Sequence, residues 1–371
     1  MDYVTRDGGH RYPTDVPIWR CPETGAPVNL TPGVGLSRNQ IDPAERSLWR
    51  YAAAIRVDKA ARVELGEGWT PLIPIELAAG NVRLKMESMA PSGSFKDRGM
   101  AVLVAYLRAH GIDRVMLDSS GNAAASLACY AAAAGMHCTV LVPAHTSPAK
   151  VAQMRVYGAE VELVGGTRQD VSNAALARAE TGVFYASHNW QPFFIEGTKT
   201  LAYEIWEQYG FGLPDNIIIP VGYGSNLLGC HIGFDELMRR GEIDRMPRLF
   251  AAQPANVGAL VRAFEAGVTE PVEFTPEKTI AEGVAAAKLV RTAEAMDALR
   301  ASGGAAVGVP EEEILPAVHL LARRGAFVEP SCAVAAVAYE QLVSAGTIGA
   351  DEETVLVMTG NGLKSIDAIM G

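Results

Sequence analysis

Short apolar runs alternate with longer Ala- and Leu-rich segments along most of the chain, from Leu84 onward. Runs rich in branched apolar residues are typical of buried strands, and apolar residues at helical spacing are typical of helices. We expect strands at 84–88, 114–120, 137–143, 159–166, 183–188 and 248–254, near 216–220, and within 353–362. We expect helices at 97–110, 122–135, 147–158 and 169–182, and another after the turn that follows Pro220.

This alternation of strands and helices predicts parallel, doubly wound sheets. Because the strands outnumber those of one compact sheet, the expected fold class is α/β, with two open-sheet lobes and a cleft between them. We expect a loop-rich N-terminal extension at 1–66, with a short helix near 44–55. We expect a large domain formed by 67–98 and 185–371, and a small mobile domain at 99–184.

Composition narrows the class of partner. The chain has 371 residues, a net charge of −10 and a pI of about 5.3. The basic face that nucleic acids and anionic membranes require is therefore not expected. Five scattered cysteines without metal-ligand spacing predict no metal site. The polar start and the interrupted apolar window at 123–143 predict neither a signal peptide nor a membrane span, and hence a cytoplasmic protein.

Lys96 stands in the stretch PSGSFKDRGM, where a turn follows an expected strand and a helix begins. A helix start disfavours a cation because the helix dipole is positive there. Lys96 is therefore either a solvated side chain or a lysine that Phe95 and the turn shield partly from water. Desolvation and the helix start would both lower its pKa, and a neutral amine can attack a carbonyl group.

Two other strand ends turn into helices through small polar residues. In DSSGNAAAS (118–126), main-chain amides with Ser119, Ser120 and Asn122 would suit a carboxylate, although a plain capped loop has the same pattern. In IPVGYGSNLLG (219–229), glycines let the backbone approach an anion, and the helix start favours a phosphate. This turn is neither a Walker loop nor a full dinucleotide fingerprint, so by itself it is weak evidence for a phosphate site.

A fourth strand ends in VMTGNGLK (357–364), where the Thr359 hydroxyl either bonds a ring nitrogen or closes a local turn. All four stretches follow the carboxyl ends of expected strands, where open α/β sheets bind ligands. A lysine nucleophile, a phosphate cradle, a carboxylate loop and a hydroxyl for a ring nitrogen together suit pyridoxal 5'-phosphate holding an amino acid.

The same segments resemble, in order, the threonine synthase-like branch of the fold type II pyridoxal-phosphate enzymes, which includes threonine and serine dehydratases. The likeness covers about residues 40–365. It is carried by LGEGWTPL (65–72), GSFKDRG (93–99), SSGNAAAS (119–126), EGTKT (196–200), the 221–229 turn, TIAEG (279–283), VEPSCA (328–333) and TGNGLK (359–364). The resemblance implies a tryptophan synthase β-like fold with the cofactor in the cleft between two lobes, and a homodimer.

The resemblance also implies roles for single residues. Lys96 would form the Schiff base, Phe95 would flank the ring, and Asn122 would contact the phenolic oxygen. Thr359 would meet the pyridine nitrogen and, being a hydroxyl in place of an acid, would leave it largely unprotonated. The phosphate would lie on Gly222, Tyr223, Gly224, Ser225, Asn226 and Leu227. The substrate would lie on Ser119, Ser120, Gly121, Asn122 and Ala123, with His188 and Asn189 beside it.

The chain departs from threonine synthases of similar layout at three positions. They tend to carry Thr, Arg and Asn where this chain has Ala123, Phe194 and Tyr223. Each lost hydrogen bond to a charged group costs about 1.5–3 kcal/mol, so three lost donors leave little to neutralise a phosphate dianion. O-phosphohomoserine is therefore not the expected substrate.

We expect a pyridoxal-phosphate-dependent carbon–oxygen or carbon–nitrogen lyase. Lys96 would abstract the α-proton of a small polar amino acid and the β-substituent would leave, with or without addition of a second nucleophile. One alternative is threonine synthase, which converts O-phosphohomoserine to threonine and phosphate. Another is a non-catalytic, regulatory pyridoxal-phosphate-binding protein. A dinucleotide-dependent dehydrogenase is disfavoured because the full glycine fingerprint is missing.

Overall fold

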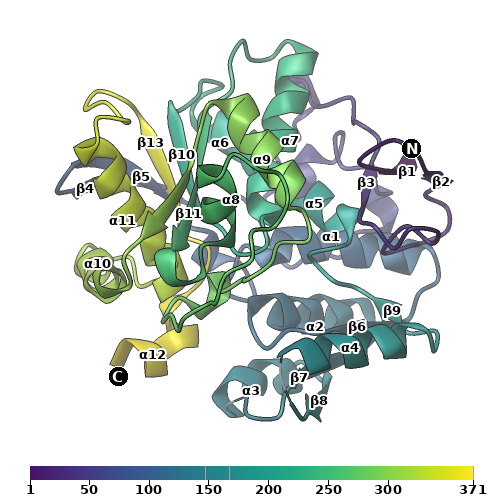
Figure 1. The fold of residues 1–371 in the computed structure, drawn as a ribbon. Coiled ribbons are helices and arrows are strands. Elements are labelled where there is room, and N and C mark those ends of the chain that lie inside the picture. The colour runs from purple at the N-terminus through teal and green to yellow at the C-terminus, as the bar shows by residue number, and fades with distance from the viewer. Residues whose placement is uncertain (147, 167, 371) are drawn as a thin grey trace. The chain divides into compact units, whose positions relative to one another are not determined.

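The protein is described by a computed structural model that covers residues 1–146, 148–166 and 168–370, and Figure 1 gives its elements. The chain forms two compact units. Unit 1 combines residues 1–33, 41–67 and 96–198, and unit 2 combines 34–40, 68–95 and the chain from Lys199 onward. The domain boundaries expected from the sequence stay a prediction.

Unit 1 is built on a four-stranded parallel sheet with the strand order β8-β7-β6-β9. Its strands are β6 (Arg114–Leu117), β7 (His137–Pro143), β8 (Glu160–Val164) and β9 (Phe184–Tyr185). Its helices are α1 (Lys96–Ala109), α2 (Asn122–Ala134), α3 (Pro148–Val156), α4 (Arg168–Ala179) and α5 (Pro192–Thr198). A small antiparallel sheet of order β2-β1-β3 joins β1 (Asp2–Thr5), β2 (Arg11–Pro13) and β3 (Val28–Leu30).

Unit 2 contains a six-stranded sheet with the strand order β12-β11-β10-β13-β5-β4, in which only β4 runs antiparallel to its neighbour. The strands are β4 (Leu72–Leu77), β5 (Gly80–Lys85), β10 (Asn216–Pro220), β11 (Arg248–Pro254), β12 (Ala306–Val309) and β13 (Thr354–Val357). The helices are α6 (Thr200–Gln208), α7 (Ser225–Arg240), α8 (Ala259–Glu265), α9 (Thr292–Ser302), α10 (Glu311–Arg323), α11 (Pro330–Ser344) and α12 (Ile366–Met370).

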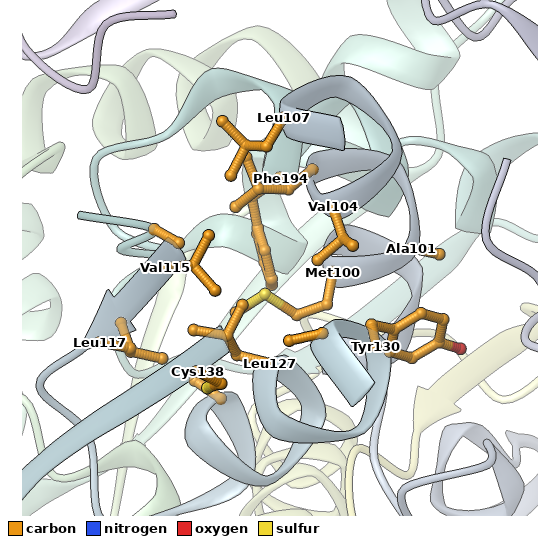
Figure 2. Packing of buried hydrophobic residues seen from close by; sticks show 14 of the residues in the cluster. Met100, Ala101, Val104, Leu107, Val115, Leu117, Leu127, Tyr130, Cys138 and Phe194 are labelled. Carbon is orange, nitrogen blue, oxygen red and sulfur yellow. The ribbon is translucent and has the colours of Figure 1, made fainter. Parts of the chain in front are cut away.

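The core of unit 1 lies where α1 meets α2, α5 and the sheet. Figure 2 shows Leu107 of α1 beside Phe194, and Met100 of α1 between Phe194 and Leu127. The Phe194 ring lies directly on Gly99, and any side chain at that glycine would overlap it. The absence of a Cβ at this position therefore lets α1 and α5 approach closely.

Several expected elements are shorter than the pattern suggested. The strand at 114–120 ends at Leu117, and the Asp118 side chain that follows accepts a hydrogen bond from the Tyr185 hydroxyl at 2.5 Å. The strand at 183–188 has only two residues. The helix expected near 44–55 is one 3-10 turn, Leu48–Tyr51, capped by Ser47.

Two further differences concern the ends of the expected elements. The small β1–β3 sheet was not expected in the N-terminal extension. The first residue of the helix expected at 147–158 lies outside the described residues, and α3 begins at Pro148. Within the described ranges, no helix combines the length and the apolar character that a membrane crossing would need.

Candidate active site

In unit 2, the glycine-rich turn lies between β10 and α7. The main-chain N–H of Val221 donates to Ala252, and that of Leu228 donates to Gly224, on either side of the turn. The first amides of a helix lack intrahelical acceptors, and α7 carries no acidic residue in its first turn. Gly224 has a φ of 89°, which favours glycine. The turn therefore presents donors and no negative charge.

The side chain of Asn226 provides the test of whether a phosphate fits this turn. Asn226 is buried, and neither its Nδ2 nor its Oδ1 meets a hydrogen-bond partner in the part of the chain that the structure describes. A buried amide without partners costs about 1–3 kcal/mol. A phosphate oxygen would accept from Nδ2 and from the adjacent α7 amides. The donor set thus fits the phosphate of pyridoxal phosphate.

Thr359 lies at the same sheet edge as this turn, because it follows β13, the parallel neighbour of β10. Its side chain is buried, and its Oγ1 lies 3.4 Å from the Cys332 Sγ. Its carbonyl accepts from the Phe95 N–H at 3.0 Å. Unit 2 therefore brings together Phe95, Thr359 and the predicted phosphate turn along adjacent strands β5, β13 and β10.

In unit 1, Lys96 is the first residue of α1 and is half-buried. Its Nζ lies 5.7 Å from the centre of the Phe194 ring, and the His188 ring meets Phe194 edge-on at 5.7 Å between centroids. Phe194 is fully buried and His188 is 7% exposed. Within this unit, aromatic rings therefore form part of the surroundings of the Lys96 amine.

The two loops predicted to hold the substrate follow β6 and β9, which are parallel neighbours. The main-chain N–H of Ala186 donates to Met116, so both loops leave the same edge of the sheet. One loop carries Ser119, Ser120 and Gly121 and leads into Asn122 and Ala123, the first residues of α2, and the other loop carries His188 and Asn189. Neither loop, over 118–123 or 186–191, contains a lysine or an arginine.

The N-terminal segment supports the second loop. The Trp19 ring meets the rings of Tyr185 and Trp190 edge-on, at 5.0 Å and 5.4 Å between centroids. The Gln191 Nε2 donates to the Ile18 carbonyl at 3.0 Å. These contacts within unit 1 fix the chain on both sides of His188.

Sequence reasoning missed a buried polar network next to Lys96. The Ser126 hydroxyl donates to Asp97 at 2.6 Å, and the Tyr130 hydroxyl donates to Glu67 at 2.8 Å. Burial raises the pKa of Glu67 to about 7. The signal was present in the sequence, because Asn122, Ser126 and Tyr130 are spaced four residues apart on α2 and so share one face.

Comparison with known proteins agrees with this geometry. Residues 63–360 match a family described as pyridoxal-phosphate dependent enzyme. The chain is 36% identical over 341 residues to the threonine synthase of Methanocaldococcus jannaschii, covering 90% of this chain and 84% of that protein. It is 35% identical over 325 residues to the threonine synthase of Mycobacterium bovis, with 83% and 88% covered.

Solved structures give the same fold. A threonine deaminase from T.th. matches with a TM-score of 0.67 at 28% identity, covering 79% of this chain and 92% of that one. Threonine deaminase isoform 2 from Solanum lycopersicum matches with a TM-score of 0.71 at 22% identity, covering 93% and 97%. This chain belongs to the pyridoxal-phosphate dependent enzymes.

The family membership confirms three expectations: a fold type II α/β architecture with parallel sheets, an enzyme of the threonine synthase and dehydratase kind, and pyridoxal phosphate as cofactor. The roles assigned above to single residues, Lys96 included, stay predictions.

Proposed function

We propose that this enzyme is a lyase that removes the α-proton of a small polar α-amino acid and eliminates its β-substituent, with or without later addition of a nucleophile. The observation that carries the proposal is the buried Phe194 ring, 5.7 Å from the Lys96 amine. A phosphate-bearing substrate requires a cation near this place, and an aromatic ring provides none.

Two groups of residues in unit 2 would hold the cofactor. The amides of 222–227 and the Asn226 side chain would take the phosphate, and the Thr359 hydroxyl would meet the ring nitrogen. Lys96 would carry the covalent attachment. When bound, pyridoxal phosphate withdraws electrons from the α-carbon of the amino acid and so acidifies its proton.

Lys96 would act as the base, accepting the α-proton at its Nζ. The face of the Phe194 ring favours the ammonium group that results, because an aromatic face attracts a cation. Half-burial of Lys96 limits access of water to the amine. The chain thus supplies an amine whose protonated form is stabilised by an aromatic face.

The substrate carboxylate would lie at the start of α2. Gly121 occupies the N-cap position with no side-chain cap, so the first amides of the helix are directed at the loop of Ser119 and Ser120. The substituent at the β-carbon would meet His188 and Asn189, which are hydrogen-bonding groups. A hydroxyl, amide or amine substituent suits such a pocket better than a phosphate dianion.

Threonine synthase is a second candidate, and one observation favours it. Relatives that are 32–36% identical over 90% or more of this chain bear that name. The absence of basic residues in both substrate loops speaks against it. A cytoplasmic homodimer, with a small-molecule substrate and no nucleic-acid or membrane partner, belongs to the main proposal.

The test is turnover by the purified holoenzyme. Amino acids bearing a β-hydroxyl, amino, sulfonate, acetoxy or phosphate group, and O-phosphohomoserine, are compared for release of keto acid, ammonia and phosphate. We expect release from at least one non-phosphorylated substrate at a higher kcat/KM than from O-phosphohomoserine. Preferential phosphate release with formation of threonine would establish the second candidate instead.

Two variants frame this test. Lys96→Ala should lose turnover of every substrate, because no base remains, whereas Lys59→Ala replaces an exposed lysine of unit 1 and should keep it. A wild-type protein that binds the cofactor through Lys96 and turns over none of these compounds would support a regulatory role.

A further inference from the structure

Cys332 is a buried thiol that the proposed chemistry does not use. It is the third residue of α11, is fully buried, and lies beside Thr359 in unit 2. Its Sγ accepts from the Gly360 N–H at 3.1 Å, lies 3.2 Å from the Gly360 carbonyl oxygen, and lies 3.4 Å from the Thr359 Oγ1. The sulfur is thus in direct contact with the Thr359 hydroxyl.

The positions of the protons follow from the strengths of these partners. Burial and the nearby Glu329 carboxylate raise the pKa of Cys332 to about 12, so the thiol keeps its single proton. That proton goes to the Gly360 carbonyl, which is a stronger acceptor than a hydroxyl and lies closer. Sulfur is then the acceptor beside the Thr359 hydroxyl proton, and it is a weak one.

We propose that Cys332 keeps a strong hydrogen-bond acceptor away from the Thr359 hydroxyl: its weakly accepting sulfur leaves the Thr359 proton available to the ring nitrogen of pyridoxal phosphate, so that this nitrogen stays unprotonated. The proposal rests on the proposed function, because it needs Thr359 at the ring. It explains what a thiol does at this place that a hydroxyl would not.

A serine at position 332 would direct the Thr359 hydroxyl proton away from the ring nitrogen. Its oxygen is a strong acceptor and would compete for the Thr359 proton. The Thr359 oxygen would then present lone pairs to the ring nitrogen, which would take up a proton in order to donate to them.

The neighbouring Glu329 and Ser331 have other contacts and do not take the place of the thiol beside the Thr359 hydroxyl. The Glu329 carboxylate lies against Gly360, where any added side chain would overlap it, and its main-chain N–H donates to the Gly360 carbonyl at 3.1 Å. The Ser331 hydroxyl accepts from the Gly283 N–H at 3.0 Å. A negative charge on Glu329 would favour a protonated ring nitrogen. The hydrogen bond from Thr359, which favours the unprotonated form, therefore has to be stronger than this effect.

The experiment is ¹⁵N NMR of holoenzyme loaded with pyridoxal phosphate labelled at the ring nitrogen. We expect the wild type to show the unprotonated nitrogen, and Cys332→Ser to raise the ratio of protonated to unprotonated nitrogen by about tenfold, equal to one pKa unit. Cys138→Ser makes the same atomic exchange at a buried thiol of the unit 1 sheet and should leave the signal unchanged.

Two more variants keep the proposal falsifiable. Cys332→Ala removes the sulfur and adds no acceptor, so the nitrogen should remain unprotonated even if the serine variant does not fold. In a Thr359→Val background, Cys332→Ser should no longer move the signal, because the hydroxyl through which it acts is gone.

The possible failures are distinguishable. An unchanged signal in Cys332→Ser, or a protonated nitrogen in Cys332→Ala, overturns the role of Cys332 while Thr359→Val still alters the signal. If Thr359→Val leaves the nitrogen signal unaltered, Thr359 is not at the ring, and both this inference and that part of the proposed site are wrong.

Discussion

Two buried carboxylates, Glu204 in unit 2 and Glu67 in unit 1, have opposite surroundings. Both are fully buried. Glu204 forms a salt bridge with the buried Lys85 and accepts the main-chain N–H groups of Trp69 and Thr70 at 2.7 Å and 2.8 Å. Every one of these partners offsets a negative charge.

Glu67 has neutral donors on one oxygen only. Its Oε2 accepts from the Leu65 N–H and the Tyr130 hydroxyl, both at 2.8 Å, whereas its Oε1 is buried with no partner among residues 1–146, 148–166 and 168–370. Burial raises its pKa to about 7, and the negative charge of Asp97 adds to the effect. Asp97 follows Lys96 directly.

The difference shows which carboxylate is a fixed structural group and which can titrate. In unit 2 the Lys85 cation and two main-chain amides pair with Glu204, so the network ties the 68–70 turn to β5 and α6. In unit 1 the carboxyl group can gain and lose a proton near neutral pH, and its neighbour Asp97 adjoins the proposed catalytic lysine. Perturbed groups of this kind are common at functional sites.

The largest expected effect comes from removing the cation. Lys85→Met leaves Glu204 buried without its counter-charge and should lower the free energy of unfolding by about 3–5 kcal/mol. Urea unfolding at neutral pH measures it. The double variant Lys85→Met/Glu204→Gln removes the unpaired charge and keeps one of the two oxygens that accept from the Trp69 and Thr70 amides, so it should recover part of the loss. A single variant as stable as wild type would contradict the assigned role of Lys85.

The next largest effect is the pH dependence of stability that Glu67 should cause. The folded-state pKa of about 7 lies above the ordinary value of 4.5, so the folded protein holds this proton more tightly than the unfolded chain. The bound proton therefore makes its whole contribution to the free energy of unfolding below pH 4.5, and this contribution is lost as the pH rises to about 7. The loss amounts to about 3 kcal/mol.

Glu67→Gln removes this titration. We expect its free energy of unfolding to vary less between pH 4.5 and pH 7 than that of wild type, so that the variant gains relative stability as the pH rises. Glu64→Gln, an exposed glutamate nearby, should keep the wild-type pH dependence. Parallel curves for wild type and Glu67→Gln would show that Glu67 does not titrate in this range.

A smaller effect is expected at the hydroxyl that partners Glu67. Tyr130→Phe removes a bond that lowers the pKa of Glu67, so the variant should shift the pH window of Glu67 upward. Above that window it should cost about 1.5 kcal/mol, because a hydrogen bond to a charged group is lost. Unfolding curves at several pH values test this, and a loss that does not change with pH would assign Tyr130 to packing alone.

The sequence predicts the strands of the parallel sheets well where runs are long and branched, as in NIIIP (216–220) and HCTVLVP (137–143). It does not predict the β1–β3 sheet, whose strands are too short for a periodic pattern to emerge. At 114–120 the apolar residues form the predicted strand, but the strand ends at Leu117, before the polar residues 118–120.

For the candidate site, turn chemistry in the sequence predicts which loops lie at the sheet edges. It does not predict which side chains meet. The contact of Cys332 with Thr359 joins residues 27 apart, and the partner-free oxygen of Glu67, within the described part of the chain, depends on packing of the whole unit. Such pairings arise from tertiary geometry, which local periodicity does not encode.

The close fit of Phe194 on Gly99 limits how the enzyme could have diversified. With the ring in this place, position 99 has room only for glycine, so the residue at one position limits the residue at the other. Once the ring is in place, any substitution of the glycine is blocked until the ring is lost. Position 194, which we propose to bear on the choice of substrate, therefore cannot vary independently of position 99.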